Sequence, residues 1–143
     1  MTFLQIRSLR KSYGAALALD GVSMDIAQGS RTAIVGPSGS GKTTLLRILA
    51  GFEVPDSGSV TLGGELLANE ATMIAAHLRG IGYVPQDGAL FPHLRVADNV
   101  GFGLARHMDG RKERIEELMD MVALDRAMLQ RYPHELSGGQ QQR

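Results

Sequence analysis

The 143-residue sequence contains no cysteine, carries no net charge and has no long apolar run. Without cysteine, neither a disulfide framework nor a cysteine-ligated metal site can form, which is consistent with a reducing cytoplasm. Basic and acidic residues number 15 each, so there is no basic excess of the kind that favours nucleic-acid binding. No apolar run approaches the roughly 20 residues of a membrane span, and the polar residues close to Met1 argue against a signal peptide. If the protein works at a membrane, we expect it to dock there through a partner.

The first part of the chain has the hydrophobic pattern of short strands separated by turns. Apolar and polar residues alternate at 3–7 and 22–26, the period of half-buried strands, and Gly14 and Gly21 punctuate the stretch between them. The nearly continuous apolar run 32–35 predicts a strand that is buried on both faces of a parallel sheet. We therefore expect a β-rich beginning that leads into a parallel sheet.

A helix is expected soon after this strand. It runs from Lys42 to Ala50, and Gly51 is its predicted stop. Its apolar face is predicted to contain Leu45, Leu46 and Leu49. The strand, the glycine-rich stretch and the helix form a single unit in the sequence.

The rest of the chain is predicted to change from short strands to helices. The short elements are a turn at 55–58, a strand at 59–62, a turn at 63–64 and a strand at 81–84 that Pro85 ends. Ile115, Leu118, Met119 and Val122 recur with the spacing of an amphipathic helix, and 136–140 has the pattern of a helix start. The sequence therefore predicts an α/β architecture with a helical insertion.

The glycine-rich stretch matches the pattern G-x-x-x-x-G-K-[ST] at every fixed position. Its residues are Gly36, Pro37, Ser38, Gly39, Ser40, Gly41, Lys42 and Thr43, with Thr44 following. Glycines allow the backbone to wrap closely around phosphate oxygens, and successive N–H groups with a helix N-terminus then form an anion site. Lys42 can reach the β- and γ-phosphates, and the Thr43 hydroxyl can ligate Mg²⁺. The loop predicts nucleotide binding, but kinases, GTPases and transport ATPases all share it.

A second motif near the end of the sequence distinguishes among these classes. Its residues are Leu136, Ser137, Gly138, Gly139 and Gln140, and Gln141, Gln142 and Arg143 continue it. This pentapeptide downstream of a phosphate loop is the signature of the ABC ATPases. The chain resembles the nucleotide-binding subunit of an ABC transporter over essentially its whole length, and Ser137 also has the character of a helix N-cap.

The resemblance implies a fold and a division into parts. The fold is α/β, a P-loop NTPase core with a RecA-like parallel sheet, an N-terminal antiparallel β part and a helical subdomain. The chain 1–143 is then a partial ABC ATPase domain that lacks the C-terminal part of the core. Its predicted parts are a β-rich part with the P-loop core at 1–86, a helical subdomain at 87–135 and the signature with its helix start at 136–143.

The resemblance also assigns roles to residues outside the phosphate loop. Two subunits pack head to tail, so that Ser137 and the residues Gly138 to Gln140 close over the γ-phosphate held by the partner's loop. Gln86 has the position of a residue that ligates Mg²⁺ or orients the attacking water. Tyr13 has the position of an aromatic residue that stacks on adenine. Lys42, Gln86 and Ser137 are thus the predicted catalytic residues, with ATP and Mg²⁺ as cofactors.

Two histidines do not fit a metal or proton-transfer role. His93 and His134 both lie beside prolines, and neither has a partner ligand at a useful spacing. We expect both to be ordinary loop residues.

Finer resemblance points to an importer. The segments 86–94 and 99–104 are similar to the group that imports polyamines, sugars, sulfate and ferric iron. The pair Asp87-Gly88 and the segment 131–136 are most similar to ferric iron subunits. The implied partners are a second copy of the subunit, transmembrane permease subunits and, indirectly, a periplasmic or extracellular solute-binding protein, with no nucleic acid. The implied location is the cytoplasmic face of the cell membrane.

The family's next elements are expected beyond Arg143. They are a strand ending in Asp-Glu, which supplies a Mg²⁺ ligand and a general base, and then a switch histidine. We therefore expect the 143 residues to be a truncated chain with absent or very slow hydrolysis and an unpaired sheet edge prone to aggregation. Two alternatives stay open: an ABC-type ATPase of DNA repair or translation, and a nucleotide-binding module without catalysis.

Overall fold

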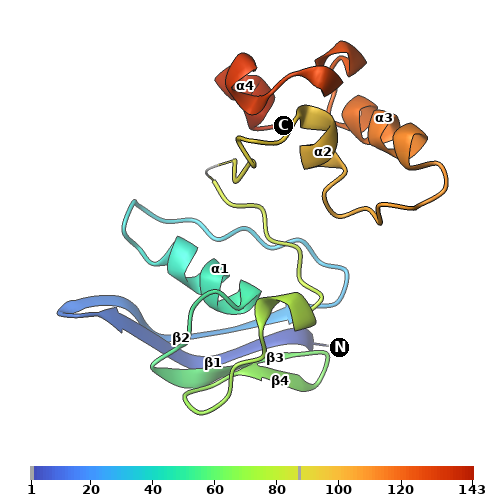
Figure 1. The fold of residues 1–143 in the computed structure, drawn as a ribbon. Helices are drawn as coiled ribbons and strands as arrows, with labels where there is room; N and C mark the ends of the chain where they lie inside the picture. The colour runs from blue at the N-terminus through green and yellow to red at the C-terminus, as the bar shows by residue number, and fades with distance from the viewer. Residues whose placement is uncertain (1, 87) are drawn as a thin grey trace. The chain divides into compact units, whose positions relative to one another are not determined.

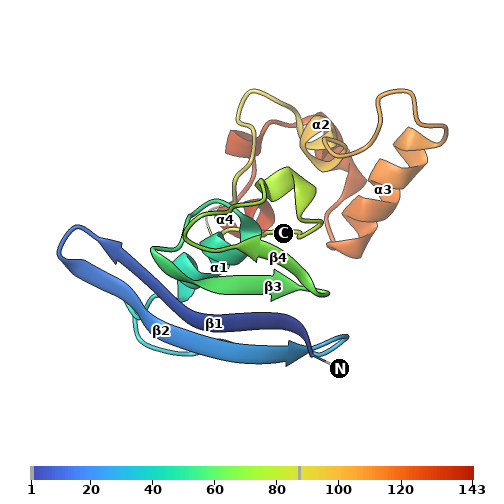
Figure 2. The ribbon, with the colours of Figure 1, turned by 90° about the horizontal axis from the view of Figure 1, so that it is seen from below.

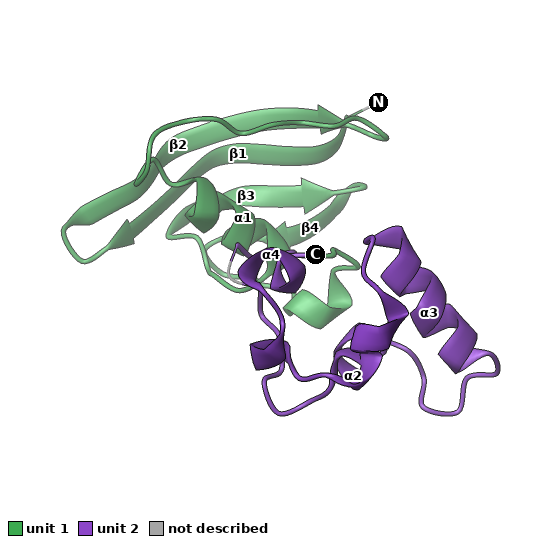
Figure 3. Cartoon of the chain, turned by 90° about the horizontal axis from the view of Figure 1, so that it is seen from above, with its two compact units in different colours: residues 1–83 green, residues 84–143 purple. Residues whose placement is uncertain are grey.

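A computed structural model describes residues 2–86 and 88–143. Met1 and Asp87 lie outside the described residues, and Asp87 is the acidic residue of the pair Asp87-Gly88 that resembles ferric iron subunits. The chain forms two compact units, residues 1–83 and residues 84–143 (Figure 3). Each unit has its own hydrophobic core.

Unit 1 is built on a four-stranded antiparallel sheet. Its strands are β1 (Thr2–Tyr13), β2 (Ala16–Ala27), β3 (Ser57–Leu62) and β4 (Glu65–Ala68). They lie in the order β2-β1-β3-β4, and α1 (Lys42–Ala50) covers one face of the sheet (Figures 1 and 2). The strands predicted at 3–7, 22–26 and 59–62 are confirmed, and the strand β4 was not predicted.

The first two strands form a long hairpin whose turn is at Gly14. The turn at Gly14 is confirmed, with φ 58°, but Gly21 lies inside β2 rather than between two strands. From the pair Leu9–Val22 to the pair Lys11–Leu19, β1 advances by two residues and β2 by three. The extra residue bulges β2 next to Gly21, whose φ of 68° accommodates the bulge. Gly21 therefore marks a bulge within β2 and does not separate two strands.

The core of unit 1 lies between the sheet and α1. Ile6 of β1 pairs with Val60 of β3, both are fully buried, and Leu45 and Ile48 pack on them from the helix. The predicted bounds of α1 are confirmed, but the prediction that Leu46 shares the apolar face is wrong, since Leu46 is exposed. Successive residues of an α-helix are turned by about 100°, so a residue next to Leu45 points away from the sheet.

A buried guanidinium secures the C-terminal end of α1. Arg79 is only 5% exposed, and its Nη1 donates to the carbonyls of Ile48 at 2.7 Å and Leu49 at 2.9 Å. Its Nη2 and Nε donate to the carbonyls of Leu67 and Ile74. Burial lowers the pKa of Arg79, because the charged form loses hydration. The cation is thus held entirely by carbonyl dipoles, at the helix end where the macrodipole favours positive charge.

Two predicted strands do not form. The runs 32–35 and 81–84 are irregular, Val35 and Val84 are 88% and 92% exposed, and only Ile34 and Ile81 pack on the core. A strand that is buried in a parallel sheet requires a hydrogen-bonded neighbour, and among the described residues every strand pair is antiparallel. Without a neighbouring strand, an apolar run has no backbone partners for the hydrogen bonds of a sheet.

Unit 2 is helical, as predicted for the second half of the chain. Its helices are α2 (Val96–Val100), α3 (Arg111–Met121) and α4 (Gly138–Gln141), with 3₁₀ turns η2 (Arg126–Gln130) and η3 (Pro133–Glu135). A further 3₁₀ turn, η1 (Ala76–Leu78), belongs to unit 1. Val96, Met119 and Leu136 form the core of unit 2. The amphipathic pattern that predicted α3 is confirmed, since Ile115 and Met119 are buried.

Candidate nucleotide-binding site

The phosphate loop leads into α1, which begins at Lys42 as predicted. Gly39 and Gly41 both adopt left-handed backbone conformations, with φ of 82° and 86°. A Cβ at position 41 would lie 2.3 Å from the carbonyl oxygen of Ala18. Only glycine at this position therefore allows the start of α1 to rest against β2.

The side chain of Lys42 folds into the loop that precedes it. Its Nζ donates to the carbonyls of Gly36 at 2.8 Å and Pro37 at 2.6 Å, and to the Ser40 hydroxyl at 3.2 Å. Lys42 is the only charged side chain between residues 36 and 44. The loop thus encloses a single ammonium group whose nearest acceptors are neutral oxygens, and an anionic oxygen would be a stronger partner.

The N-terminus of α1 has no side-chain cap. Gly41 occupies the N-cap position, so no side chain accepts a hydrogen bond from the first turn, and the first turn contains no acidic residue. The first N–H groups of a helix lack partners within the helix and carry its positive dipole end. The Thr43 side chain is exposed beside them and Thr44 is half-buried. The arrangement fits a phosphate group in charge and in hydrogen-bond donors.

Tyr13 ends β1 and is 47% exposed. It belongs to the same hairpin as Ala18, which contacts the phosphate loop at Gly41. Unit 1 therefore contains both Tyr13 and the phosphate loop. The stacking role of Tyr13 toward adenine stays a prediction.

A charged cluster that sequence reasoning missed lies next to Tyr13. Lys11 Nζ lies 3.1 Å from Glu53 Oε1, 3.2 Å from Asp56 Oδ1 and 5.5 Å from the centre of the Tyr13 ring. Glu53 and Asp56 are more than 40 residues from Lys11 in sequence, so no local pattern indicates these contacts. The one feature of the sequence that could have indicated the cluster is the position of Glu53 shortly after the end of α1.

Ser137 caps α4, as its sequence predicts. Its hydroxyl accepts from the Gln140 N–H at 3.4 Å, and the Ser137 N–H donates to the Gln140 side-chain oxygen at 2.9 Å. The Gln140 side chain is therefore engaged in fixing Ser137. A Cβ at Gly138 or Gly139 would meet no atom within 4 Å, so contacts within this chain do not explain why both are glycine.

Gln141 is a second residue whose part in the signature region was missed. Its side-chain Nε2 donates to the carbonyls of Pro133 at 2.8 Å and Leu136 at 3.0 Å. These bonds tie α4 to the turn that precedes Ser137. The signal was the position of Gln141 directly after the predicted motif.

Gln86 belongs to unit 2 and is exposed. It borders a hollow of about 420 Å³ whose other wall includes Gln141, Gln142 and Arg143. The predicted Mg²⁺ ligands Thr43 and Gln86 thus lie in different units. Their joint role stays a prediction, as do the catalytic roles of Lys42, Gln86 and Ser137.

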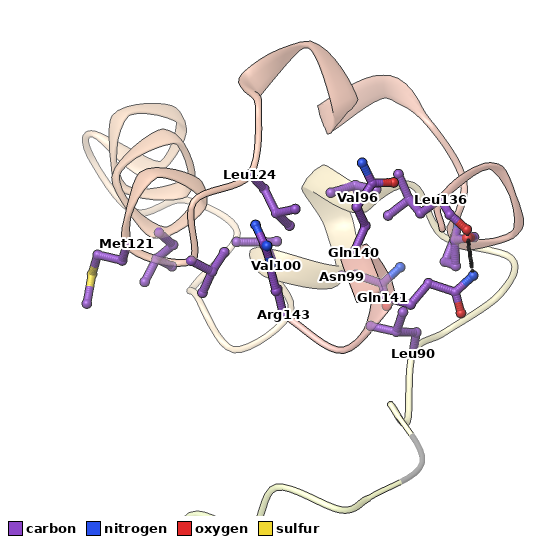
Figure 4. A pocket seen from close by; sticks show the side chains of 13 residues that line it. Leu90, Val96, Asn99, Val100, Met121, Leu124, Leu136, Gln140, Gln141 and Arg143 are labelled. Atoms are coloured by element: carbon purple, nitrogen blue, oxygen red, sulfur yellow. Dashed lines mark hydrogen bonds between the residues drawn. The ribbon is translucent and has the colours of Figure 1, made fainter. Parts of the chain in front are cut away.

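A second hollow in unit 2 is largely apolar and measures about 320 Å³. Figure 4 shows side chains from α2, α4 and the turn after α3 around it. Leu136 and Gln140 of the signature segment and Arg143 contribute to its wall. The core residues Val96 and Leu136 form part of its lining, so the hollow continues the packing of unit 2.

The two histidines considered above both contact aromatic rings. His93 lies edge-on to Phe91 with ring centres 6.2 Å apart, and His134 stacks on Tyr132 at 5.7 Å. In the range 2–143 without residue 87, no three histidine, aspartate or glutamate side chains gather as a metal site would require. Nor does any helix in this part of the chain have the length and apolar character needed to cross a bilayer.

Comparison with known proteins identifies the family. The family model described as "ABC transporter" matches residues 19–143. The Fe(3+) ions import ATP-binding protein FbpC of Mesorhizobium japonicum is 64% identical over the whole chain, and that of Serratia marcescens is 59% identical. The chain spans 40% and 41% of the lengths of these two relatives.

Solved structures agree with the family model. The dimeric structure of a bacterial ABC transporter cassette superposes with a TM-score of 0.84 at 30% identity, over 96% of this chain and 65% of that chain. The cbiO1 protein of Clostridium perfringens, part of the ABC transporter complex cbiONQ, gives 0.76 at 27% identity, over 99% of this chain and 58% of that one. The antiparallel sheet, the phosphate loop with its helix and the capped signature segment are therefore parts of an ATP-binding cassette fold. The chain belongs to the ABC transporter family.

Proposed function

We propose that the chain is the ATP-binding part of an ABC importer subunit and that the loop Gly36–Thr43 holds the triphosphate. The observation that carries the proposal is the Lys42 ammonium, enclosed by the loop oxygens at 2.6–3.2 Å. Phosphate oxygens would replace these neutral acceptors and would also meet the uncapped N–H groups of α1.

Mg²⁺ is proposed as the second cofactor. In unit 1, the Thr43 hydroxyl, exposed at the start of α1, is the neutral oxygen donor that would hold it, while a role for Gln86 of unit 2 rests on the family resemblance alone. When bound, the ion neutralises charge on the β- and γ-phosphates. Lys42 and the first turn of α1 hold the triphosphate from the protein side.

We further propose that a second copy completes the site. The dimeric cassette to which the chain is similar supports a dimer. In the proposed head-to-tail arrangement, Ser137, Gly138 and Gly139 approach the γ-phosphate held by the partner's loop, while Gln140 fixes Ser137 through the capping box. The open space beside both glycines leaves room for a ligand oxygen at the backbone.

The proposed cargo is ferric iron. Its support is that relatives 57–64% identical to this chain are named Fe(3+) ions import ATP-binding proteins. The proposed partners are transmembrane permease subunits and, indirectly, a solute-binding protein, with the subunit on the cytoplasmic face of the membrane. Deleting the gene in its host and measuring uptake of radioactive ferric iron tests the cargo. Unchanged iron uptake would reject it and would leave the DNA-repair or translation alternative standing.

The 143 residues by themselves are proposed to bind ATP without steady-state turnover. The general base and the further Mg²⁺ ligand that the family resemblance places after Arg143 are outside these 143 residues. Ordinary ATPase turnover by the purified chain would contradict this part of the proposal.

The experiment that tests nucleotide binding compares two lysine variants by isothermal titration calorimetry with MgATP. Lys42→Met removes the ammonium that contacts the loop, and Lys112→Met removes an ammonium on α3 whose side chain is 83% exposed. Charge-assisted hydrogen bonds are each worth about 1.5–3 kcal/mol, so Lys42→Met is expected to raise the Kd roughly 10- to 100-fold. Lys112→Met should bind like the unchanged chain. Equal affinity for both variants would reject the proposed site.

A further inference from the structure

The ammonium of Lys11 is mostly withdrawn from solvent, although it lies near the end of an edge hairpin. Its side chain is 13% exposed and lies between two carboxylates, Glu53 at 3.1 Å and Asp56 at 3.2 Å. Few lysines are buried to this degree without paired charges. The pairing here joins β1 to the segment that follows α1.

Asp56 is held in place by two backbone groups of β1 as well as by Lys11. Asp56 Oδ2 accepts from the Ser12 N–H at 2.7 Å, and the Asp56 N–H donates to the Arg10 carbonyl at 2.9 Å. The side chain of Glu53 is 20% exposed. The cluster is therefore fixed to the backbone of β1 on one side and to the segment after α1 on the other.

The charge states of the cluster are those of stable ion pairs. Burial raises the pKa of Glu53, but hydrogen bonds from Lys11 and the Tyr13 hydroxyl outweigh it, so the pKa is lowered. Burial likewise opposes the charge of Lys11, and the two carboxylates outweigh it, so the pKa of Lys11 is raised. At neutral pH, Glu53 is therefore an anion paired with the Lys11 cation.

The same cluster contacts the Tyr13 ring. Lys11 Nζ lies over one face of the ring, 5.5 Å from its centre, and is itself held by Glu53 and Asp56. Yet 47% of Tyr13 stays exposed. A ring that is contacted on one face, with the rest open, is prepared to receive a flat partner on its free face.

The cluster also relates the ring to the phosphate loop. Ala18, on the strand that pairs with β1, lies against Gly41 at the start of α1, while Lys11 reaches Glu53, just beyond the end of α1. The hairpin is thus attached at both ends of the helix that follows the loop. A shift of the hairpin would move Tyr13 relative to the loop.

We propose that Lys11, held by Glu53 and Asp56, is a positioning residue that fixes the Tyr13 ring against the base of a bound nucleotide. It thereby determines how strongly the chain prefers a nucleoside triphosphate to bare triphosphate. This inference rests on the proposed nucleotide site. The competing explanation is that the ion pairs only fasten the hairpin to the segment after α1.

The two explanations differ in which ligand is affected. Titrations with MgATP and with magnesium tripolyphosphate measure the base and the phosphate contributions separately. Base stacking on an aromatic ring is worth enough that Tyr13→Ala should raise the Kd for ATP roughly 5- to 100-fold. Lys11→Met should raise it about threefold or more, and neither variant should change the Kd for tripolyphosphate. Lys11→Arg, which keeps the cation, should recover most of the ATP affinity.

A matched control lies one residue away on the same strand. Arg10 pairs with Asp20 at 2.6 Å, so Arg10→Met removes an ion pair of the same hairpin that does not involve Tyr13. It should leave both Kd values unchanged. In the double variant Lys11→Met with Tyr13→Ala, the effect should not exceed that of Tyr13→Ala alone, because Lys11 acts through the ring.

The outcomes distinguish a failure of this inference from a failure of the proposed nucleotide binding. If the unchanged chain binds neither ligand, the proposed function fails and this inference fails with it. If ATP binds but Lys11→Met weakens both ligands equally, or neither, the positioning role is rejected and the nucleotide site stands. Should Lys11→Met not fold, Lys11→Gln keeps a polar side chain of similar length and removes the cation over the Tyr13 ring. An ATP affinity unchanged in Lys11→Gln would then overturn the inference.

Discussion

Gly41 and Ala18 are in such close contact that a Cβ at position 41 would lie 2.3 Å from the Ala18 carbonyl oxygen. This contact places the start of α1 on β2 and thereby fixes where the phosphate loop ends. The sheet edge and the loop are therefore one structural unit, and the glycine is required by contact as well as by backbone conformation.

Two glycines of the loop allow the effect of the contact with Ala18 to be measured apart from the effect of the left-handed backbone conformation. Gly39 and Gly41 share a positive φ, but a Cβ at 39 would meet nothing within 4 Å. Gly39→Ala should lose about 1–2 kcal/mol from left-handed strain alone, whereas Gly41→Ala should lose clearly more and also weaken ATP binding. Urea unfolding of both variants measures the difference. Equal losses would show that the contact with Ala18 does not matter.

The Arg79 guanidinium is expected to be the most important charged group for the stability of unit 1. Arg79→Met leaves buried carbonyls at the end of α1 without donors, which should cost about 3 kcal/mol. Arg47→Met, in the last turn of the same helix but exposed, should stay within about 0.5 kcal/mol. Denaturant midpoints give both values. A small loss for Arg79→Met would mean that water replaces its hydrogen bonds.

Two methionines on α3 provide a test of the core of unit 2. Met119 is fully buried and Met121 is 74% exposed. Met119→Ala should destabilise the unit by about 2–5 kcal/mol, while Met121→Ala should have almost no effect. The phosphate loop is in unit 1. The Met119→Ala variant should therefore keep its affinity for ATP at temperatures where unit 1 is still folded. Comparable stability of the two variants would contradict the described packing.

The acid side of the stability profile should depend on Asp56 and Glu53. The pKa of Asp56 is lowered by the Ser12 N–H and then by Lys11, and that of Glu53 by Lys11 and Tyr13 against the opposing effect of burial. A lowered folded-state pKa means that the unfolded chain binds protons first as pH falls. The contribution of these two groups to stability is complete above their ordinary pKa values of 3.8 and 4.5, and it is lost as pH falls through the lowered folded-state pKa values. Asp56→Asn should therefore flatten the dependence of the unfolding free energy on pH below about pH 4, measured by circular dichroism in urea. An unchanged slope would exclude Asp56 as a contributor.

Local patterns in the sequence predicted the local structure well. The bounds of α1, its stop at Gly51 and the capping of α4 by Ser137 depend on neighbouring residues, and all three are confirmed. The runs 32–35 and 81–84 also had a clear local pattern. They failed as strands because a strand depends on a neighbour, which no local pattern supplies.

Long-range side-chain contacts were beyond local patterns for the same reason. Arg79 contacts Ile48 across 31 residues, and Lys11 contacts Asp56 across 45. Each contact becomes visible only when the fold brings separate elements together. The loop residues could be named from sequence because phosphate binding by backbone groups requires a contiguous motif. The residues that hold Tyr13 could not, because they come from two distant segments.

The central claim is that the loop from Gly36 to Thr43 holds the triphosphate of ATP. Hydrogen–deuterium exchange of the 143-residue chain with and without MgATP tests it most directly, because the amides of the loop and of the first turn of α1 would be the groups that bind phosphate. The account predicts slower exchange in peptides that cover residues 36–45, and the same slowing with tripolyphosphate. Unchanged exchange in these peptides at saturating MgATP would contradict it.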